Sequence, residues 1–428
     1  MRVAFLTLGC KVNQYDTDAM KALFEKAGHE IVDFSQKAEV YIVNTCTVTA
    51  VGDKKSRQMV SRAHALSPDA AVIVTGCYAQ SAPEEAAALP GVVAVAGTAE
   101  RARIVEIAEN AVNGIRRSEV RAYLGKEPFE ELDVSREGRT RAHLKIQDGC
   151  DRYCAYCIIP YVRGPVRSRS LADVKKQLVL LEREGYREIV FTGIHLMSYG
   201  KDIKNVGLLD AVAQADGLTG IARIRLGSLE PQLFTKEFVQ ALADNPKICR
   251  QFHLSLQSGS AGVLARMGRR YTKDEYRACV GSLRAAMPGC AVTTDIITGF
   301  PGETEAEFEE TLAFVREIAF SRIHVFPYSR RRGTRAYDMP DQVPSEVKKE
   351  RAARLIALGR VLEAEYAKSL VGSAQDVLFE ERKGAYLYGH TGTYVWTKVK
   401  TDAPLEGAIK TVTITKAQGD ALEGMISA

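Results

Sequence analysis

The chain has 428 residues, of which 46% are hydrophobic and 26% charged, and its formal net charge at pH 7 is +5. This length exceeds what one ordinary compact core holds, so we expect two or three domains. No run of about 18 uncharged apolar residues occurs, which argues against a membrane-spanning helix. The small basic excess permits an RNA partner without requiring one.

The first residues and the cysteine count indicate a cytoplasmic protein. The apolar stretch Val3–Leu8 is too short for a signal sequence, and no small-residue cleavage site follows it. Nine cysteines are an odd number, which argues against a disulfide framework and leaves thiols free to bind a metal or a cluster. We therefore expect a monomer in the cytoplasm that makes no membrane contact.

Residues 1–125 alternate short apolar runs with helical patterns, which predicts an N-terminal three-layer domain around a parallel sheet. We expect strands at Val3–Leu8, Val40–Asn44, Ala71–Thr75 and Val92–Ala96, and helices over Asp16–Ala27 and Lys54–Ala65. Three cysteines, Cys10, Cys46 and Cys77, each come directly after one of the first three strands. The carboxyl ends of parallel strands meet at one sheet edge, where ligands bind. Three ordinary buried cysteines are the alternative, but this repeated placement favours a shared metal or cluster site.

Residues 126–140 are charged and lack hydrophobic periodicity, which predicts a linker. Over residues 141–368 the strand–helix alternation resumes and predicts a (β/α)6-type partial TIM barrel of the α/β class. Its expected strands are His143–Gln147, Glu188–Thr192, Arg223–Leu226, Phe252–Leu256, Val292–Ile296 and Ile323–Phe326. One long amphipathic helix from about residue 345 ends this part.

Residues 369–428 change to short alternating runs punctuated by glycine, which predicts a small antiparallel β-barrel. Small barrels commonly stack unpaired bases on aromatic side chains. Tyr386, Tyr388, Tyr394 and Trp396 could serve in this way, although half of them may equally fill the barrel. We select Trp396 as a candidate RNA contact.

The segment "GCDRYCAYC" places Cys150, Cys154 and Cys157 directly after the first predicted strand of the barrel. Catalytic groups of such barrels lie at the carboxyl ends of the strands. Structural zinc sites need four ligands, usually in two pairs, and no second C-x2-C pair exists here, so zinc is the weaker alternative. A 4Fe-4S cluster is normally held by four thiolates. A cluster held by three leaves one iron free for a cofactor or substrate.

This C-x3-C-x2-C pattern resembles the motif of the radical S-adenosylmethionine (SAM) superfamily. The order of the three parts, with a C-terminal barrel of the TRAM type, resembles the methylthiotransferase family. So do the segments "CAYCIIPYVRGPVRSR", "RLGSLEP" and "TTDIITGFPGET". Within that family, "LGCKVNQYDTDAM" and "HVFPYSRRRGTRAYDMPDQVP" most resemble the branch that acts on N6-threonylcarbamoyladenosine in tRNA. The isopentenyladenosine branch more often has Gln-Met where this chain has Lys11-Val12.

The resemblance implies two 4Fe-4S clusters, one on Cys150, Cys154 and Cys157 and one on Cys10, Cys46 and Cys77. It implies SAM as both radical source and methyl donor, and an electron donor such as flavodoxin or ferredoxin. The expected product carries a methylthio group on C2 of N6-threonylcarbamoyladenosine next to the tRNA anticodon, with the anticodon loop as partner. Three alternatives stay open: methylthiolation of isopentenyladenosine, methylthiolation of a ribosomal protein side chain, and a non-catalytic iron-sulfur protein that binds RNA.

Further candidates follow from position alone. We expect SAM contacts from Tyr156, Gly193, Ser228, Gln257, Ile297 and Gly299. Each of these could equally be a core residue, a strand-end cap or a turn residue. Arg163, Arg167 and Arg169 follow the cysteine loop and could neutralise RNA phosphates. A solvated or ion-paired surface is the alternative for these three arginines.

Overall fold

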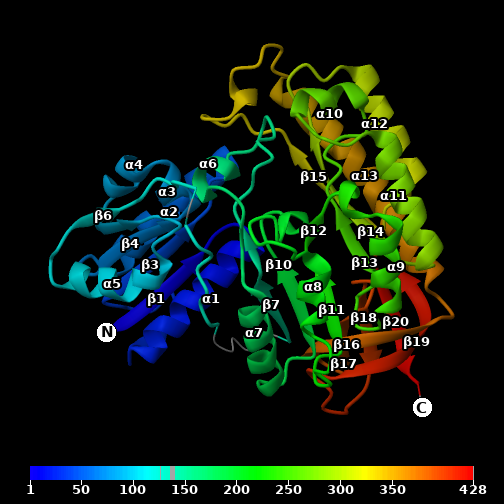
Figure 1. Ribbon diagram of the computed structural model, residues 1–428, viewed down its shortest axis with the longest axis horizontal. Coiled ribbons are helices and arrows are strands. Elements are labelled where there is room, and N and C mark those ends of the chain that lie inside the picture. Colours follow the sequence, from blue (N-terminus) through cyan, green and yellow to red (C-terminus); the bar gives the residue numbers. More distant parts are fainter. Residues whose placement is uncertain (126, 135–139, 428) are drawn as a thin grey trace.

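The computed structural model describes residues 1–125, 127–134 and 140–427. The chain runs from an N-terminal α/β sheet through a curved central sheet to a small C-terminal barrel (Figure 1). Residues 126 and 135–139 of the predicted linker lie outside the described residues. No helix within the described part of the chain is both long enough and apolar enough to cross a membrane.

The N-terminal part is an all-parallel six-stranded sheet in the order β2-β1-β3-β4-β5-β6. Its strands are β1 (Arg2–Thr7), β2 (Glu30–Val32), β3 (Val40–Thr45), β4 (Ala71–Gly76), β5 (Val92–Ala96) and β6 (Arg117–Glu119). One face packs against α1 (Lys11–Lys26) and α5 (Ile104–Val112), and the other against α2 (Ala50–Leu66), α3 (Cys77–Ser81) and α4 (Pro83–Ala87). The predicted three layers are confirmed, with β2 and β6 as short additional edge strands.

The central strands β3 and β4 are buried along their whole length. Both of their faces meet helices, so every side chain lies against protein. The β-branched and apolar residues of "VYIVNT" and "AVIVTG" suit this position. This is why continuous apolar runs, and not alternating ones, identified these strands in the sequence.

The central part is a partial barrel made of two neighbouring parallel sheets, in the orders β7-β10-β11 and β12-β13-β14-β15. Its strands are β7 (Arg141–Lys145), β10 (Glu188–Thr192), β11 (Arg223–Leu226), β12 (Ser228–Leu229), β13 (Gln251–Leu254), β14 (Ala291–Thr298) and β15 (Arg322–Pro327). A two-stranded hairpin, β8 (Gln147–Asp148) with β9 (Arg167–Ser168), follows β7. The six predicted strand regions are present, and the two-residue strand β12, which was not predicted, follows the third of them after Gly227.

Helices cover the outer face of this partial barrel. They are α7 (Leu171–Arg183), α8 (Leu208–Ala213), α9 (Lys236–Asp244), α10 (Ala261–Met267), α11 (Lys273–Ala286), α12 (Glu305–Ile318) and α13 (Ser345–Ser369). The short helix α6 (Ile159–Arg163) instead packs against α3 of the N-terminal part. Side-chain caps start several of the outer helices: Ser170, Thr272 and Thr304 each accept a hydrogen bond from the amide three residues on, at 3.1–3.2 Å. Such caps satisfy amides that have no partner inside the helix.

The two faces of the central sheet differ in chemistry. Ala142, Leu144 and Ile189 belong to the core beneath the helices. Because successive strand residues point to opposite faces, Arg141 and Glu188 lie on the inner face, as do the alternate residues of the other strands. The inner face is therefore polar and charged, and the outer face is apolar.

The C-terminal barrel is closed, in the order β16-β17-β18-β20-β19. Its strands are β16 (Ala374–Lys383), β17 (Tyr386–Thr391), β18 (Trp396–Lys400), β19 (Ile409–Gln418) and β20 (Ala421–Ile426). Four pairs are antiparallel, and the parallel pair of β18 with β20 completes the closure. The predicted small barrel is confirmed, with this one parallel pair added.

This barrel docks against the amino ends of β7, β10 and β11. Arg141 forms an ion pair with Glu380 at 2.8 Å, and Arg223 donates to the carbonyl of Asp376 at 2.6 Å. The Arg225 guanidinium lies 4.7 Å from the ring centroid of Tyr394. Tyr394 therefore packs inside this contact, which is a correction to its expected role in stacking RNA bases.

Glu188 is the anionic centre of this contact. It pairs with Arg225 at 2.8 Å, Arg141 at 3.2 Å and Arg223 at 3.3 Å. Burial alone would raise the pKa of Glu188, but the three arginines lower it from 4.5 to about 2. A depressed pKa stabilises the fold above the unfolded value of 4.5, and the stabilisation is lost as pH falls toward 2.

We expect Glu188→Gln to lower the free energy of unfolding by about 3 kcal/mol at pH 7, because three buried arginines lose their shared counter-charge. Urea unfolding at pH 7 and pH 3 measures this loss of unfolding free energy. At pH 3 the loss relative to the unaltered chain should be less than half of its value at pH 7. Glu381→Gln is the control, because Glu381 pairs with Lys383 on the surface and should change stability by only about 0.5 kcal/mol. An equal effect of Glu188→Gln at both pH values would contradict the ionic explanation.

Candidate functional site

Cys10, Cys46 and Cys77 lie at one edge of the N-terminal sheet. They follow β1, β3 and β4, which are neighbours in that sheet. Cys77 is buried, Cys46 partly buried and Cys10 exposed. The structure thus brings the three predicted residues to the same edge, as their positions after the strands predict, while their role as ligands stays a prediction.

Glycines make this approach possible. Gly9 has φ +105°, and a Cβ there would lie 3.0 Å from the Cys46 sulfur and 2.9 Å from its Cβ. Gly76 has φ +89°, and a Cβ there would lie 2.6 Å from the carbonyl oxygen of Thr45. Only glycine combines a positive φ with such close contact. The glycine before Cys10 and the one before Cys77 therefore let the strand-end loops pack directly on one another.

The second set, Cys150, Cys154 and Cys157, lies on the loop between β8 and α6. The Cys150 amide donates to the carbonyl of Gly164 at 3.0 Å, which closes the base of the loop. The Cys150 sulfur accepts from the Arg152 amide at 3.4 Å, and the Cys154 sulfur accepts from Arg269 Nη1 at 3.3 Å. These donors favour the negative charge that a thiolate ligand carries.

The donor set fits a cluster held by thiolates. Burial, followed by the charge of Cys154, raises the pKa of the Cys157 thiol to about 12, and burial raises that of Cys150 and of Cys77 to about 11. These thiols stay protonated near neutral pH unless a metal displaces the proton. Within the described ranges, no three side chains of the ligating types converge on the point that one metal ion would need. A 4Fe-4S cluster differs, because each thiolate binds a different iron.

An ionic group beside the second loop was not predicted from the sequence. Glu230, which follows β12, pairs with Arg269 at 2.6 Å and with Arg152 at 2.9 Å. Burial alone would raise the pKa of Glu230, but His195, Arg269 and Arg152 lower it to about 2. The only sequence signal was the place of Glu230 after a strand, in "SLEP". Glu230 thus fixes the two arginines that contact this loop.

The predicted SAM contacts fall into two groups. Tyr156 is packed beside Phe300, with ring centroids 6.5 Å apart, and burial raises its pKa well above 10. Gly193 follows β10, where a Cβ would lie 2.9 Å from the Gln147 side-chain oxygen. Both positions are explained by packing, so their contact with SAM stays a prediction.

Ser228 and Ile297 keep some solvent access, whereas Gln257 is buried. Ser228 is exposed and Ile297 partly exposed. Gln257 has φ +69°, unusual for a residue with a side chain, and its backbone bonds to β14 on both sides. The Gly299 amide, in contrast, already donates to Glu303 at 3.0 Å. SAM contacts by these four residues remain predictions.

Arg163, Arg167 and Arg169 are a correction. Their exposed fractions are 0%, 5% and 0%, so they cannot form a surface that binds RNA phosphates. Arg169 instead pairs with Asp173 at 2.6 Å, and Arg167 stacks on the Tyr123 ring. Burial of these arginines was not evident from the sequence, because partners such as Asp16 and Tyr123 lie far from them along the chain.

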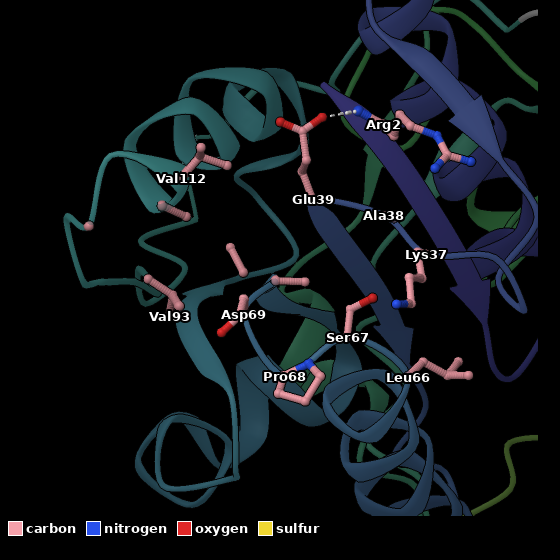
Figure 2. Close-up of a pocket in the computed structure, with 14 residues that line it drawn as sticks. Arg2, Lys37, Ala38, Glu39, Leu66, Ser67, Pro68, Asp69, Val93 and Val112 are labelled. Carbon is pink, nitrogen blue, oxygen red and sulfur yellow. Dashed lines mark hydrogen bonds between the residues drawn. The ribbon is translucent and has the colours of Figure 1, made fainter.

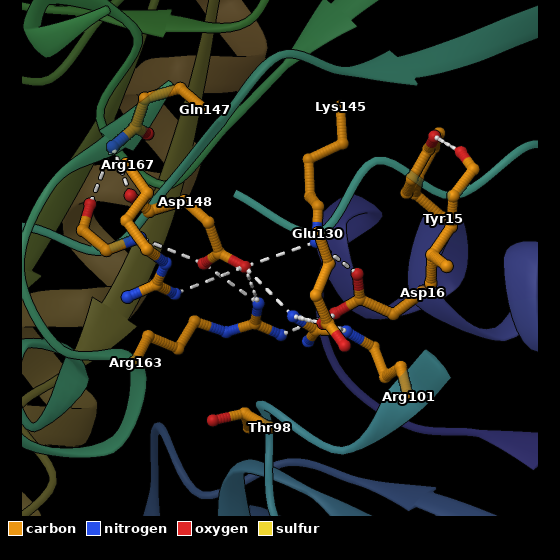
Figure 3. A network of polar contacts seen from close by, with 12 residues as sticks. Tyr15, Asp16, Thr98, Arg101, Glu130, Lys145, Gln147, Asp148, Arg163 and Arg167 are labelled. Atoms are coloured by element: carbon orange, nitrogen blue, oxygen red, sulfur yellow. Dashed lines mark hydrogen bonds and ion pairs between the residues drawn. The ribbon is translucent and has the colours of Figure 1, made fainter. Parts of the chain in front are cut away.

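Arg163 belongs to a buried polar network between the N-terminal sheet and the central barrel (Figure 3). Asp16 on α1 pairs with Arg101 at 2.9 Å and with Lys145 at 2.5 Å. Asp148 on β8 pairs with Lys145 and Arg163, both at 3.1 Å. The network therefore joins the sheet that carries Cys10 and Cys77 to β8, the strand that precedes Cys150.

A surface pocket of about 630 Å³ lies at the opposite edge of the N-terminal sheet (Figure 2). Its lining includes Arg2, Lys37, Glu39 and Asp69 and contains no cysteine. The Arg2 amide donates to the Glu39 carboxylate at 2.8 Å. This pocket lies at the amino ends of the strands and is separate from both cysteine sets.

Comparison with known proteins establishes the family. Residues 2–97 match the uncharacterized protein family UPF0004, and residues 144–315 match the radical SAM superfamily. The threonylcarbamoyladenosine tRNA methylthiotransferase MtaB of Bacillus subtilis (strain 168) is 44% identical over 431 residues, which cover 97% of this chain and 94% of that protein. The chain belongs to the radical SAM methylthiotransferase family.

Other relatives of this methylthiotransferase differ in substrate. The tRNA-2-methylthio-N(6)-dimethylallyladenosine synthase of Pelotomaculum thermopropionicum is 34% identical, over 99% of this chain and 97% of that protein. Among solved structures, the radical SAM methyltransferase TsrM from Kitasatospora setae, with cobalamin and a [4Fe-4S] cluster bound, has a TM-score of 0.61 at 16% identity. The match covers 90% of this chain and 81% of the TsrM chain, and at this low identity it shows only that the two proteins share a fold.

Proposed function

We propose that this methylthiotransferase places a methylthio group on C2 of N6-threonylcarbamoyladenosine next to the tRNA anticodon. The observation that carries the proposal is the pair of three-cysteine sets, which lie at strand ends of two adjacent parts. The 44% identity to a protein named for threonylcarbamoyladenosine supports the choice of substrate.

Cys150, Cys154 and Cys157 would hold one 4Fe-4S cluster, and Cys10, Cys46 and Cys77 a second. The first set would hold the cluster whose chemistry is one-electron reduction of SAM, and the second set would hold the cluster that carries the sulfur to be methylated and transferred. A carrier such as flavodoxin or ferredoxin would deliver that electron. The chain's own residues position these groups: Arg269 and the Arg152 amide donate to the first set of thiolates.

The inner face of the central sheet supports a polar substituent on the substrate adenine. His253 pairs with Asp295 at 3.3 Å on this face. Lys11, next to Cys10, keeps solvent access, yet burial of its ammonium group and then the charges of Arg225 and Arg141 lower its pKa. Its charge therefore faces the same region. A threonylcarbamoyl group offers a carboxylate and a hydroxyl to these groups, whereas a dimethylallyl group would need an apolar pocket.

The C-terminal barrel supports binding of the anticodon loop. Trp396 is partly exposed and stacks on Tyr388, with ring centroids 5.7 Å apart and an angle of 25°. Stacking on such rings contributes about 1–3 kcal/mol per base and tolerates any sequence. We propose Trp396 and Tyr388 as the RNA contacts in place of the three buried arginines.

Nucleoside mass spectrometry tests the substrate. The chain would be expressed in a bacterial strain whose tRNA carries both threonylcarbamoyladenosine and isopentenyladenosine without methylthio groups. We expect the methylthio group on the first nucleoside only. Lys11→Gln, which removes the charge facing the substrate carboxylate, should lower this product about tenfold while the iron content of the purified protein is unchanged.

Each alternative has its own outcome in this experiment. A methylthio group on isopentenyladenosine, or on a ribosomal protein by intact mass, would replace the proposed substrate. Absence of 5′-deoxyadenosine from anaerobic protein with reductant and SAM would indicate a non-catalytic iron-sulfur protein. Cys154→Ala is the negative control throughout.

A further inference from the structure

Among the contacts described, Arg163 is the one charged residue of the buried network that touches a candidate ligand thiol, and the neutral Asn13 side chain also lies 3.9 Å from the Cys77 sulfur. The Arg163 Nε donates to the Cys77 sulfur at 3.4 Å. Its Nη1 lies 3.1 Å from both carboxylate oxygens of Asp148, and its Nη2 donates to Asn13 at 2.5 Å and Asp16 at 3.0 Å. All three nitrogens of this fully buried guanidinium are therefore engaged.

Through these contacts one rigid group, the Arg163 guanidinium, links the two candidate cluster sites. Figure 3 shows its side chain beside Asp148. Asp148 stands two residues before Cys150, and Asn13 stands three residues after Cys10. Asn13 is itself held, because its amide donates to the carbonyls of Leu8 at 2.8 Å and Thr45 at 2.9 Å. The planar fork of arginine fixes several partners at once, which lysine does not do.

The contact with sulfur has an electronic effect as well as a geometric one. An N–H donor to a thiolate withdraws charge from it and favours the reduced state of a cluster bound there. The positive charge of Arg163 is balanced by Asp148 and Asp16. The effect of Arg163 on the Cys77 sulfur therefore comes from its directed Nε–H hydrogen bond and not from its net charge.

We propose that Arg163 is a positioning residue that sets the reduction potential of the N-terminal cluster and fixes the Cys77 loop relative to the Cys150 loop. This inference rests on the proposed function, in which Cys77 is a cluster ligand. It also explains why an arginine so near the cysteine loop is withdrawn from the surface.

Arg163→Lys tests the proposal in the full chain, reconstituted anaerobically. To isolate the N-terminal cluster, its midpoint potential is measured by EPR-monitored titration with Cys150, Cys154 and Cys157 replaced by alanine. We expect a more negative potential with iron retained. With all cysteines present, 5′-deoxyadenosine formation should persist while methylthiolation falls about tenfold or more.

Arg169→Lys is the matched control, because Arg169 is equally buried and contacts no cysteine. It should leave the potential unchanged. Asn13→Ala releases the Nη2 anchor and removes the Asn13 contact with the Cys77 sulfur, but it keeps the arginine charge. It should give a smaller shift in the same direction, and it tests the proposal if Arg163→Lys does not fold. An unchanged potential in both Arg163→Lys and Asn13→Ala overturns the inference.

The same measurements separate this inference from the proposed function. If the unaltered chain binds only about four irons, not about eight, the two-cluster proposal fails whatever Arg163 does. If it binds both clusters and Arg163→Lys keeps the unaltered potential, only the inference fails.

Discussion

Cys46→Ala and Cys154→Ala should each abolish methylthiolation, but they should leave different partial activities. Each variant removes one ligand from one set, so iron should fall from about eight to about four per chain. Cys46→Ala should still form 5′-deoxyadenosine from SAM, because the loop of Cys150 is intact. Cys154→Ala should form none. Iron analysis and chromatography of the reaction mixture measure both quantities.

Cys249→Ala is the control, because Cys249 is buried and belongs to neither set. It should retain iron and both activities. Loss of all iron in Cys46→Ala would mean that the six cysteines serve one site, contrary to the two-cluster proposal. If Cys154→Ala kept the iron content of the unaltered chain, Cys154 would not be a cluster ligand.

Gly149→Ala should lower the free energy of unfolding strongly, and by more than Gly289→Ala does. Gly149 has φ +73°, and a Cβ there would lie 1.8 Å from the carbonyl oxygen of Pro165 and 2.7 Å from that of Gly164. Both obstacles are backbone, so the loop must move as a whole. We expect a loss of at least about 3 kcal/mol in unfolding free energy and loss of the Cys150 cluster, measured by urea unfolding and iron content.

Gly289→Ala is a matched control for this variant. Gly289 also precedes a cysteine, Cys290, and has φ +75°, but nothing lies within 4 Å of its Cβ position. Only backbone strain remains there, which costs about 1–2 kcal/mol. Equal losses from the two substitutions would show that strain, and not the contact with Pro165, limits Gly149.

The architecture could be predicted because its signals are local. Continuous apolar runs identified β3 and β4, which are covered on both faces, and the alternation of strands with helices identified the parallel sheets. The position of each N-terminal cysteine directly after a strand was enough to bring the three together. The sequence holds one more indication of these loops: a glycine precedes Cys10, Cys77 and Cys150. Each of these glycines has a positive φ.

The buried network could not be predicted, because its partners are far apart in sequence. Arg163 and Asp16 are separated by 147 positions, and no periodic pattern links them. Local reasoning assigns a run of arginines to the surface, whereas tertiary pairing with Asp16 and Asp148 makes burial favourable. The additional strand β12 after Gly227 and the parallel closure of β18 on β20 likewise depend on contacts that only the fold provides.

Because the C-terminal barrel docks on Arg141 and Arg223, evolutionary loss of the barrel would affect the central sheet as well. A lineage that lost the barrel would also lose Glu380 and the ring of Tyr394, and the cations they cover would face water. The barrel and these basic positions should therefore be inherited or replaced together, which couples the proposed RNA-binding part to the stability of the central sheet.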